Sequence, residues 1–334
     1  MRALTYGLTD VGCKRDHNED AFHVDEDLGL HIVCDGMGGA LAGEVASKRC
    51  IEIVHDVVRQ NAHEIQRFDA TPTAEGRRAL CHLLDDAIQA ANTEIYAMSA
   101  KDPNQRGMGT TIVALILAGE NALIAHVGDS RIYLFRRDEI HQITEDHSLV
   151  AEQVRRGLIS PEEAERSPLS NVIMRAVGTR EITQVDTLHL ELMPGDRFLL
   201  CSDGLSGPVS APDIGNVLET QGDPRVAAEE LIQRANAGGG PDNVTAVCLF
   251  IPQDTPSQAK IPVALKVDAL EQIPLFAHMT YKELMLILDV ISERTYNAQE
   301  VIIQEGAVED EFFVLLQGRA AVTKTQRPLA KLES

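Results

Sequence analysis

Three aspartates, far apart in the sequence, each follow a short and mostly apolar run. They are Asp35, Asp129 and Asp203, and a glycine adjoins each of them. Short apolar runs that contain β-branched residues and end near glycine are typical of buried strands. We therefore expect the three carboxylates to converge at one end of a sheet.

Further acids stand in two loops. Glu19 and Asp20 lie in a charged turn that also contains Arg15, and Asp242 follows a glycine-rich turn. If these side chains join the cluster, each like-charged pair costs about 4 kcal/mol at an effective dielectric constant near 20. Several such pairs would cancel the roughly 5–15 kcal/mol that stabilises a domain. The acids must therefore be protonated, kept apart or neutralised by cations.

The ligand chemistry of such a cluster follows from its oxygen atoms. Oxygen ligands without histidine or cysteine favour Mg²⁺ or Mn²⁺ over Zn²⁺. Two such ions that share a carboxylate lower the pKa of a bridging water and polarise a phosphoryl oxygen. The guanidinium of Arg15 could hold a phosphate beside them. The joint pattern predicts hydrolysis of a phosphomonoester by the bridging water, without a covalent enzyme intermediate, although any single Asp-Gly pair can be a plain turn.

Strands must position these acids, and helices must cover the strands. Short apolar runs predict strands, and apolar residues three or four positions apart predict helices. Many antiparallel strands and a few long helices favour two sheets flanked by helices. Residues 148–170 are polar and short-helical, with Pro161 at a helix start, which indicates an inserted cap. The predicted strands span 4–8, 112–118, a run ending at Asp129, 131–135, 139–143, 188–192, 197–202 and 244–251; the predicted helices span 44–63, 80–95 and 226–235, with a polar loop at 69–72.

The composition is that of an ordinary globular protein with an acidic surface. Its 334 residues include 44% hydrophobic residues, enough for a sizeable core. The net charge of −21, from 51 acids against 30 bases, argues against nucleic acid or an anionic membrane as a main partner. We expect no signal peptide and no membrane-spanning segment. Six cysteines without CxxC spacing predict a reducing, cytoplasmic setting.

Short motifs follow one another along residues 1–251: Arg15–Asp20, Asp35–Gly39, Gly43-Glu44, Gly109–Thr111, Gly128–Arg131, Asp146–Ser148, Ser202–Gly204 and Asp242-Asn243. This series resembles the metal-dependent protein serine/threonine phosphatases of type 2C. The resemblance implies an α+β fold, a four-layer α-β-β-α sandwich of two mainly antiparallel sheets flanked by helices, with two Mn²⁺ or Mg²⁺ ions at one end. It also implies phosphoserine and phosphothreonine proteins as partners, and a cognate kinase that the enzyme opposes.

The resemblance assigns the direct metal ligands and the residues of catalysis. Asp35 would bridge the two ions, and Gly36 would offer its carbonyl oxygen. Asp203 and Asp242 would complete the direct ligands. Arg15 would hold the substrate phosphate, so Arg15 and Asp35 are the predicted catalytic residues.

Other residues have more distant roles in this family. Glu19 and Asp20 would act on the metals partly through waters. Asp129, together with Asp203, would bind a third and weaker cation. Residues 148–175 would form a variable flap beside the site.

The general acid is not assigned to a side chain. Some members of the family carry a histidine directly after the Asp-Gly pair, where this sequence has Met37. We expect a metal-bound water to protonate the leaving oxygen. His17, His126 and His147 are alternatives, although a structural role is the simpler expectation for each.

Two other functions stay open. The same fold could serve as a catalytically silent module that binds phosphoproteins, although the complete set of acids argues against this. The same chemistry could also act on small phosphoesters. A dinucleotide site is disfavoured because Leu41 stands where its third glycine belongs.

The C-terminal part differs in character. Residues 252–266 have the composition of a linker, followed by a helical pattern over 267–294 and short strands over 300–322. Residues 267–334 resemble the first half of a cyclic-nucleotide-binding β-roll with N-terminal helices. The sequence stops before the phosphate cassette of that family, so it predicts no nucleotide binding and is compatible with a fragment of a longer chain. The predicted domains are therefore 1–251, the linker 252–266, and 267–334.

Overall fold

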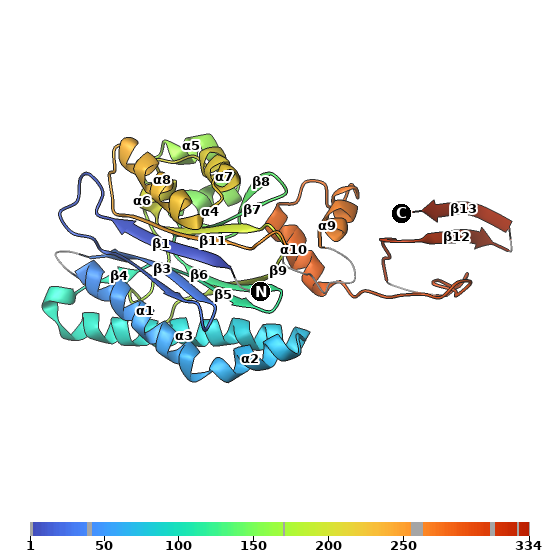
Figure 1. The fold of residues 1–334 in the computed structure, drawn as a ribbon, viewed down its shortest axis with the longest axis horizontal. Helices are drawn as coiled ribbons and strands as arrows, with labels where there is room; N and C mark the ends of the chain where they lie inside the picture. Colours follow the sequence, from blue (N-terminus) through green and yellow to red (C-terminus); the bar gives the residue numbers. More distant parts are fainter. Residues whose placement is uncertain are drawn as a thin grey trace. The chain divides into compact units, whose positions relative to one another are not determined.

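A computed structural model describes residues 3–38, 42–169, 171–254, 263–307, 311–325 and 327–333 (Figure 1). The chain divides into two compact units, Met1–Ser257 and Gln258–Ser334. No helix in the described ranges is long and apolar enough to cross a membrane.

The first sheet joins strands from both ends of the first unit. Its order is β1-β11-β10-β7-β8, and every neighbouring pair is antiparallel. The pairing of Cys201 with Ala246 places the end of one strand beside the start of the next, so the loops that carry Asp203 and Asp242 meet at one edge. The strands are β1 (Leu4–Asp10), β7 (Arg131–Arg136), β8 (Glu139–Gln142), β10 (Arg197–Cys201) and β11 (Val244–Phe250).

The second sheet carries the other acids. Its order is β2-β3-β5-β6-β9, again antiparallel, and the short β4 extends the end of β3. Asp20, the first residue of β2, lies opposite Asp35 near the end of β3. The strands are β2 (Asp20–Asp25), β3 (Leu30–Met37), β4 (Gly109–Thr110), β5 (Ile112–Ala118), β6 (Asn121–Val127) and β9 (Asp186–Glu191).

Helices cover the outer face of each sheet (Figure 1). One core joins Ile32 and Ile112 of the second sheet to the apolar stripes of α1 and α3. The other joins Leu199 and Val244 of the first sheet to α7 and α8. This layering confirms the predicted α+β fold of two antiparallel sheets flanked by helices. The helices are α1 (Ala42–Gln60), α2 (Ala62–Ala70), α3 (Ala74–Lys101), α6 (Asp203–Ser206), α7 (Ala211–Thr220) and α8 (Pro224–Ala237), with a 3₁₀ turn, η1, at Pro103–Gln105.

The helix predicted over 44–63 is two helices. The chain breaks at Asn61, and α2 continues to Ala70, so the loop expected at 69–72 is shorter than predicted. The reason is packing, because Ile65 and Phe68 are buried in the same core as α1. The next helix starts after Thr73, whose hydroxyl accepts a hydrogen bond from the Gly76 N–H.

The predicted cap contains two short helices, α4 (Leu149–Arg155) and α5 (Pro161–Glu165). Ser148 and Ser160 are their N-caps, and Pro161 starts α5 as expected. Ser170 lies outside the described residues, as does Gly39.

In the second unit, the structure differs from the sequence-based prediction in three places. The helical pattern over 267–294 is two helices, α9 (Val263–Glu271) and α10 (Tyr281–Val290), because a capping box at Thr280 and Glu283 starts a new helix. The last residues of the predicted linker, from Val263, belong to α9, and its residues 255–262 lie outside the described ranges. Strands expected over 300–322 occur among described residues only at β12 (Arg319–Lys324), which pairs with β13 (Arg327–Glu333).

Candidate metal centre

Asp35 is held by its backbone, which leaves the side chain available. Its N–H donates to the Thr111 hydroxyl at 3.0 Å. Its carbonyl accepts from the Thr111 N–H at 2.8 Å and from the Thr110 hydroxyl at 2.9 Å. The preceding residues of β3 are buried, whereas Asp35 itself is half-buried. The strand therefore ends by presenting a fixed carboxylate at the sheet edge.

Gly36 lies where no larger residue fits. A Cβ atom there would lie 2.2 Å from the Gly43 carbonyl oxygen and 2.6 Å from that of Glu19. The Gly36 N–H donates to the same Glu19 carbonyl at 3.2 Å. Three chain segments thus meet at this glycine: the loop before β2, the end of β3 and the first turn of α1.

Asp203 and Asp242 lie at the same edge of the first sheet. A Cβ atom on Gly204 would lie 1.9 Å from the Asn243 carbonyl oxygen, which shows how closely the two loops pack. The Asn243 amide donates to the carbonyls of Val11 and His17 and accepts from the Glu19 N–H at 2.8 Å. This one side chain ties the loop before β2 to the loop that carries Asp242.

Asp20 connects the two sheets. Its Oδ2 accepts hydrogen bonds from the Ser202 hydroxyl at 2.6 Å and from the Thr245 hydroxyl at 2.7 Å. Burial nevertheless raises its pKa to about 7, with smaller contributions from the negative charges of Asp203 and Asp242. The carboxylate is therefore firmly placed in a site that disfavours its charge.

The other central acids affect one another in the same way. Burial raises the pKa of Asp35 well above its usual value, and the charges of Asp20, Asp203 and Asp129 add to this. Burial and the charge of Asp242 raise the pKa of Asp203. Burial and the charge of Asp203 raise the pKa of Asp129 to about 7. Each negative charge in the group thus disfavours the ionised form of its neighbours.

Two oxygens in this region are buried without a hydrogen-bond partner among the described residues. They are Oε1 of Glu19 and Oδ1 of Asp129. An orphaned buried oxygen is costly unless a cation or water satisfies it. A set of acids with raised pKa values, orphaned oxygens and no histidine or cysteine among its members fits hard divalent cations.

Arg15 lies beside the last of these acids, Asp242. Its Nη2 lies 2.7 Å from Oδ2 of Asp242, and the side chain is half-exposed. A nearby guanidinium, that of Arg131, is engaged instead by Asp146 at 2.7 Å. Arg15 therefore presents a positive charge toward solvent at the edge of the cluster.

The histidines considered as general acids lie in different settings. His126 and His147 are buried, and their rings stack with centroids 4.7 Å apart. His147 Nδ1 accepts from the Gly128 N–H, and Nε2 faces Asp186 at 3.3 Å. The His147 ring thus helps to hold the Gly128-Asp129 turn, whereas His126 Nε2 lies 2.9 Å from the Glu145 carbonyl oxygen. His17 is exposed, and Met37 is half-buried at the end of β3.

Sequence reasoning missed the hydroxyls that hold the acids. Ser202 and Thr245 fix Asp20, and Thr111 fixes Asp35 and contacts the Ser130 hydroxyl at 2.7 Å. The sequence did contain one signal for these hydroxyls, which is a polar residue such as Thr245 inside an apolar strand. The partner of Thr245 could not be identified, because Asp20 belongs to a strand of the other sheet, 225 positions away in the sequence.

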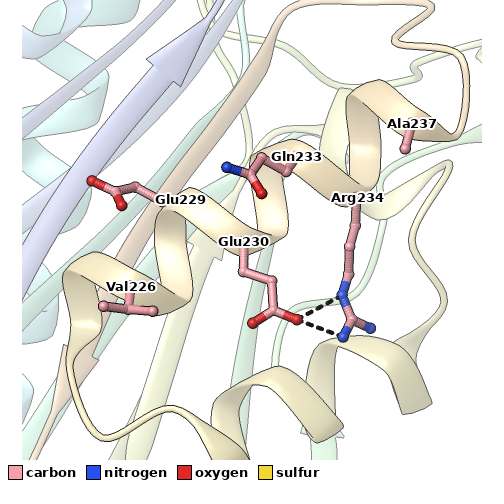
Figure 2. Close-up of a pocket in the computed structure, with 6 residues that line it drawn as sticks. All are labelled: Val226, Glu229, Glu230, Gln233, Arg234 and Ala237. Atoms are coloured by element: carbon pink, nitrogen blue, oxygen red, sulfur yellow. Dashed lines mark hydrogen bonds and ion pairs between the residues drawn. The ribbon is translucent and has the colours of Figure 1, made fainter.

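A hollow on α8 is separate from the acids. Figure 2 shows the side chains that line it, Val226, Glu229, Glu230, Gln233, Arg234 and Ala237. Glu230 Oε1 forms an ion pair with Arg234 Nη2 at 2.6 Å, and Glu229 Oε1 forms one with Arg225 Nε at 2.9 Å. Because these charges neutralise one another along one helix, the hollow offers no set of polar groups for a ligand.

Known proteins share this sequence and fold. The family model described as "Protein phosphatase 2C" matches residues 14–239. The "Serine/threonine phosphatase stp" of Listeria innocua is 38% identical over 242 residues, which cover 72% of this chain and 92% of the relative. The "Serine/threonine protein phosphatase PstP" of Mycobacterium tuberculosis strain H37Rv is 42% identical over 241 residues, which cover 72% of this chain and 43% of that relative.

Two solved phosphatase structures share this fold. The M. tuberculosis phosphatase PstP/Ppp aligns with a TM-score of 0.66 at 38% identity, covering 75% of this chain and 99% of that one. The catalytic domain of PstP in complex with two manganese ions aligns with a TM-score of 0.63 at 38% identity over the same shares.

Proposed function

The chain belongs to the protein phosphatase 2C family, and we propose that its clustered acids hold two Mn²⁺ or Mg²⁺ ions that serve hydrolysis of phosphoserine and phosphothreonine in proteins. It is a metal-dependent serine/threonine phosphatase. The observation that carries this function is the convergence of Asp20, Asp35 and Asp203 from two sheets, with mutually raised pKa values. Such a cluster is costly in a folded chain unless cations neutralise it.

The proposed ligands follow the motif match. Asp35, the Gly36 carbonyl, Asp203 and Asp242 would hold the two ions directly. When bound, the ions supply Lewis-acid polarisation of the phosphoryl group and lower the pKa of water. The backbone bonds of Thr111 to Asp35 fix the central carboxylate before a metal arrives.

Glu19, Asp20 and Asp129 are proposed to act around these ions. Asp20, held by two hydroxyls, would accept hydrogen bonds from metal-bound waters. The orphaned Oε1 of Glu19 would do the same. Asp129, with its buried and unpartnered Oδ1, would hold a third and weaker cation together with Asp203.

Arg15 is proposed to orient the substrate phosphate. Its guanidinium is half-exposed and pairs with Asp242 at 2.7 Å. A cation held by Asp242 would weaken that pairing, and Arg15 would then be available to bind a phosphate. Arg15→Ala should therefore raise KM for a phosphopeptide more than it weakens Mn²⁺ binding, and equal losses would contradict this role.

The decisive experiment measures phosphate release from phosphopeptides with Mn²⁺, and then with a chelator. Asp35→Asn and Asp242→Asn should each lower kcat by at least about 10²-fold while the folded structure persists. The matched control is Asp213→Asn, at an exposed acid on α7. Full turnover by either site variant would exclude the two-metal mechanism. Phosphopeptide binding without any metal-dependent release would instead indicate a silent binding module, and release only from small phosphoesters would redirect the substrate class.

The cellular setting is proposed from the cysteines and the chemistry. All six cysteines are free, including the exposed Cys13, which suits a reducing cytoplasm. A phosphatase of this type is expected to oppose a cognate serine/threonine kinase.

For the domains, we propose 1–251 as the catalytic domain, 252–266 as a linker and 267–334 as a partial cyclic-nucleotide-binding-like domain. The order of two helices followed by the β12–β13 hairpin supports the last assignment. No residue that would bind a nucleotide phosphate is proposed.

A further inference from the structure

A second group of metal-ligand side chains lies away from the acids, between the edge strand β2 and helix α1. His23 and Asp25 alternate along β2, so they share one face. Their partners across the ladder, Ile32 and Leu30, belong to the core that contains α1. The shared face therefore points to α1, which contributes His55.

The three side chains are close together. His55 Nε2 lies 2.9 Å from Oδ2 of Asp25, and the rings of His23 and His55 meet edge-on with centroids 4.5 Å apart. One ligand atom from each residue lies within 4.8 Å of the others. His23 Nε2 is buried and has no hydrogen-bond partner among the described residues.

Electrostatics favours the metal-binding forms of His23 and Asp25. Burial lowers the pKa of His23, and the neighbouring His55 lowers it further. Burial would raise the pKa of Asp25, but hydrogen bonds from His55 and the Leu28 N–H outweigh it and bring the pKa below its usual value. At neutral pH the group therefore offers an uncharged imidazole and an ionised carboxylate, the forms that bind metals.

We propose that His23, Asp25 and His55 form a binding site for Zn²⁺ or a similar borderline divalent ion, separate from the catalytic metals. Two imidazole nitrogens and one carboxylate oxygen suit Zn²⁺, whereas an all-oxygen set suits Mg²⁺ or Mn²⁺. The ion would replace the proton between His55 and Asp25 and would use the unpartnered nitrogen of His23. Its fourth position stays open to water.

The consequence is a clamp between two elements. Among the described residues, β2 is an edge strand that pairs with β3 alone in its sheet. An ion shared with α1 would fasten the far end of the strand that begins at Asp20. The site does not rest on the phosphatase assignment.

A second group of two histidines and an aspartate is not suited to bind a metal ion. His126, His147 and Asp186 are also close enough to hold an ion. However, the Arg175 guanidinium lies 3.2 Å from His147 Nε2 and 3.0 Å from Oδ1 of Asp186. The other ring nitrogen of His147 accepts from the Gly128 N–H. A resident positive charge and satisfied nitrogens leave no place for a cation there.

The test uses the full chain with excess Mg²⁺ to occupy the acid cluster. Co²⁺ is then titrated as a probe, because four-coordinate Co²⁺ with nitrogen ligands absorbs visible light far more strongly than six-coordinate Co²⁺ with oxygen ligands. The wild type should bind one equivalent that gives this absorption, and Zn²⁺ should displace it. The single variants His23→Gln and His55→Gln should lose that equivalent.

Two control variants alter neighbouring side chains outside the group. Asp56→Asn changes the acid beside His55, and His63→Gln removes an exposed histidine from α2; both should keep the absorption. Far-UV circular dichroism checks that each variant is folded. Zn²⁺ should also raise the Tm of the wild type but not of His55→Gln. The proposal is overturned if the wild type shows no such absorption, or if folded His23→Gln and His55→Gln retain it.

Discussion

At the scale of single residues, the site depends on groups that restrain carboxylates. Asp20 receives two hydroxyl hydrogen bonds, and Asp35 is held through its backbone by Thr110 and Thr111. Residues that orient metal ligands in this way strengthen metal binding considerably, because they fix the ligand before the ion binds.

Thr245→Val tests one of these restraints. The substitution removes the hydroxyl that donates to Asp20 at 2.7 Å, and valine has nearly the same side-chain shape as threonine. We expect the apparent Mn²⁺ affinity, measured from the metal dependence of phosphate release, to fall about 10–100-fold. Thr187→Val, at an exposed position of β9, should leave it unchanged. An unaltered Mn²⁺ dependence in Thr245→Val would show that Asp20 needs no such support.

His31 gives the molecule a pH dependence that is unrelated to the metals. Burial lowers its pKa to about 4, from the ordinary histidine value of 6.5. Between these values the unfolded chain binds the proton and the folded chain does not, so stability falls as pH drops from 6.5 toward 4. The maximum loss is about 3 kcal/mol.

Urea unfolding of the wild type and His31→Gln at pH 7 and pH 5 measures this effect. The wild type should lose more stability than the variant over that interval, because glutamine does not titrate. His63→Gln serves as the control and should behave as the wild type does. Equal losses in the wild type and His31→Gln would contradict a neutral buried His31.

At the scale of elements, glycines let the strand ends and loops approach one another. Gly36 brings β3 against the first turn of α1, and Gly204 brings α6 against the start of β11. Both glycines stand next to a predicted metal ligand, so a side chain there would move the ligand itself.

Gly36→Ala should therefore displace the site. Its Cβ would lie 2.2 Å from the Gly43 carbonyl oxygen, a backbone atom that cannot turn aside. We expect Mn²⁺ uptake, measured by calorimetry, to weaken at least about tenfold, with a lower Tm. Gly222→Ala has open space around its Cβ and should change neither quantity. Unchanged Mn²⁺ uptake in Gly36→Ala would mean that the strand end adjusts freely.

The sequence predicted some helices and strands correctly and missed others. The strands around Asp35 and Asp129 were found because a buried run closed by glycine is a local signal. Helix α2 and the split between α9 and α10 were missed, because apolar spacing continues across Asn61 and Thr280. The strands expected before β12 do not occur in the described residues 300–307 and 311–318, since β-type composition there has no sheet partner among the described residues.

At the scale of the whole molecule, all the proposed metal ligands belong to the unit Met1–Ser257. The net charge of −21 gives this chain a general attraction for divalent cations, which salt should weaken. Specific binding must therefore be separated from this background by the variants described above.

A chain that ends at Ser257 should keep the activity. Because both sheets and their covering helices lie within that unit, kcat/KM for a phosphopeptide should stay within about twofold of the full chain. Steady-state kinetics at saturating Mn²⁺ measures it. A loss of tenfold or more would assign the second unit a direct part in catalysis.

The sequence by itself determined the kinds of ligand, their order along the chain and the strands that end in them, since these are local properties of residue type and spacing. Tertiary structure alone decided which acids meet and what restrains them. Asp20 and Thr245 are 225 positions apart, and their bond exists only because two sheets stack with their edges aligned. The same stacking of helix on sheet brings His55 to His23, a juxtaposition that no spacing in the sequence predicts.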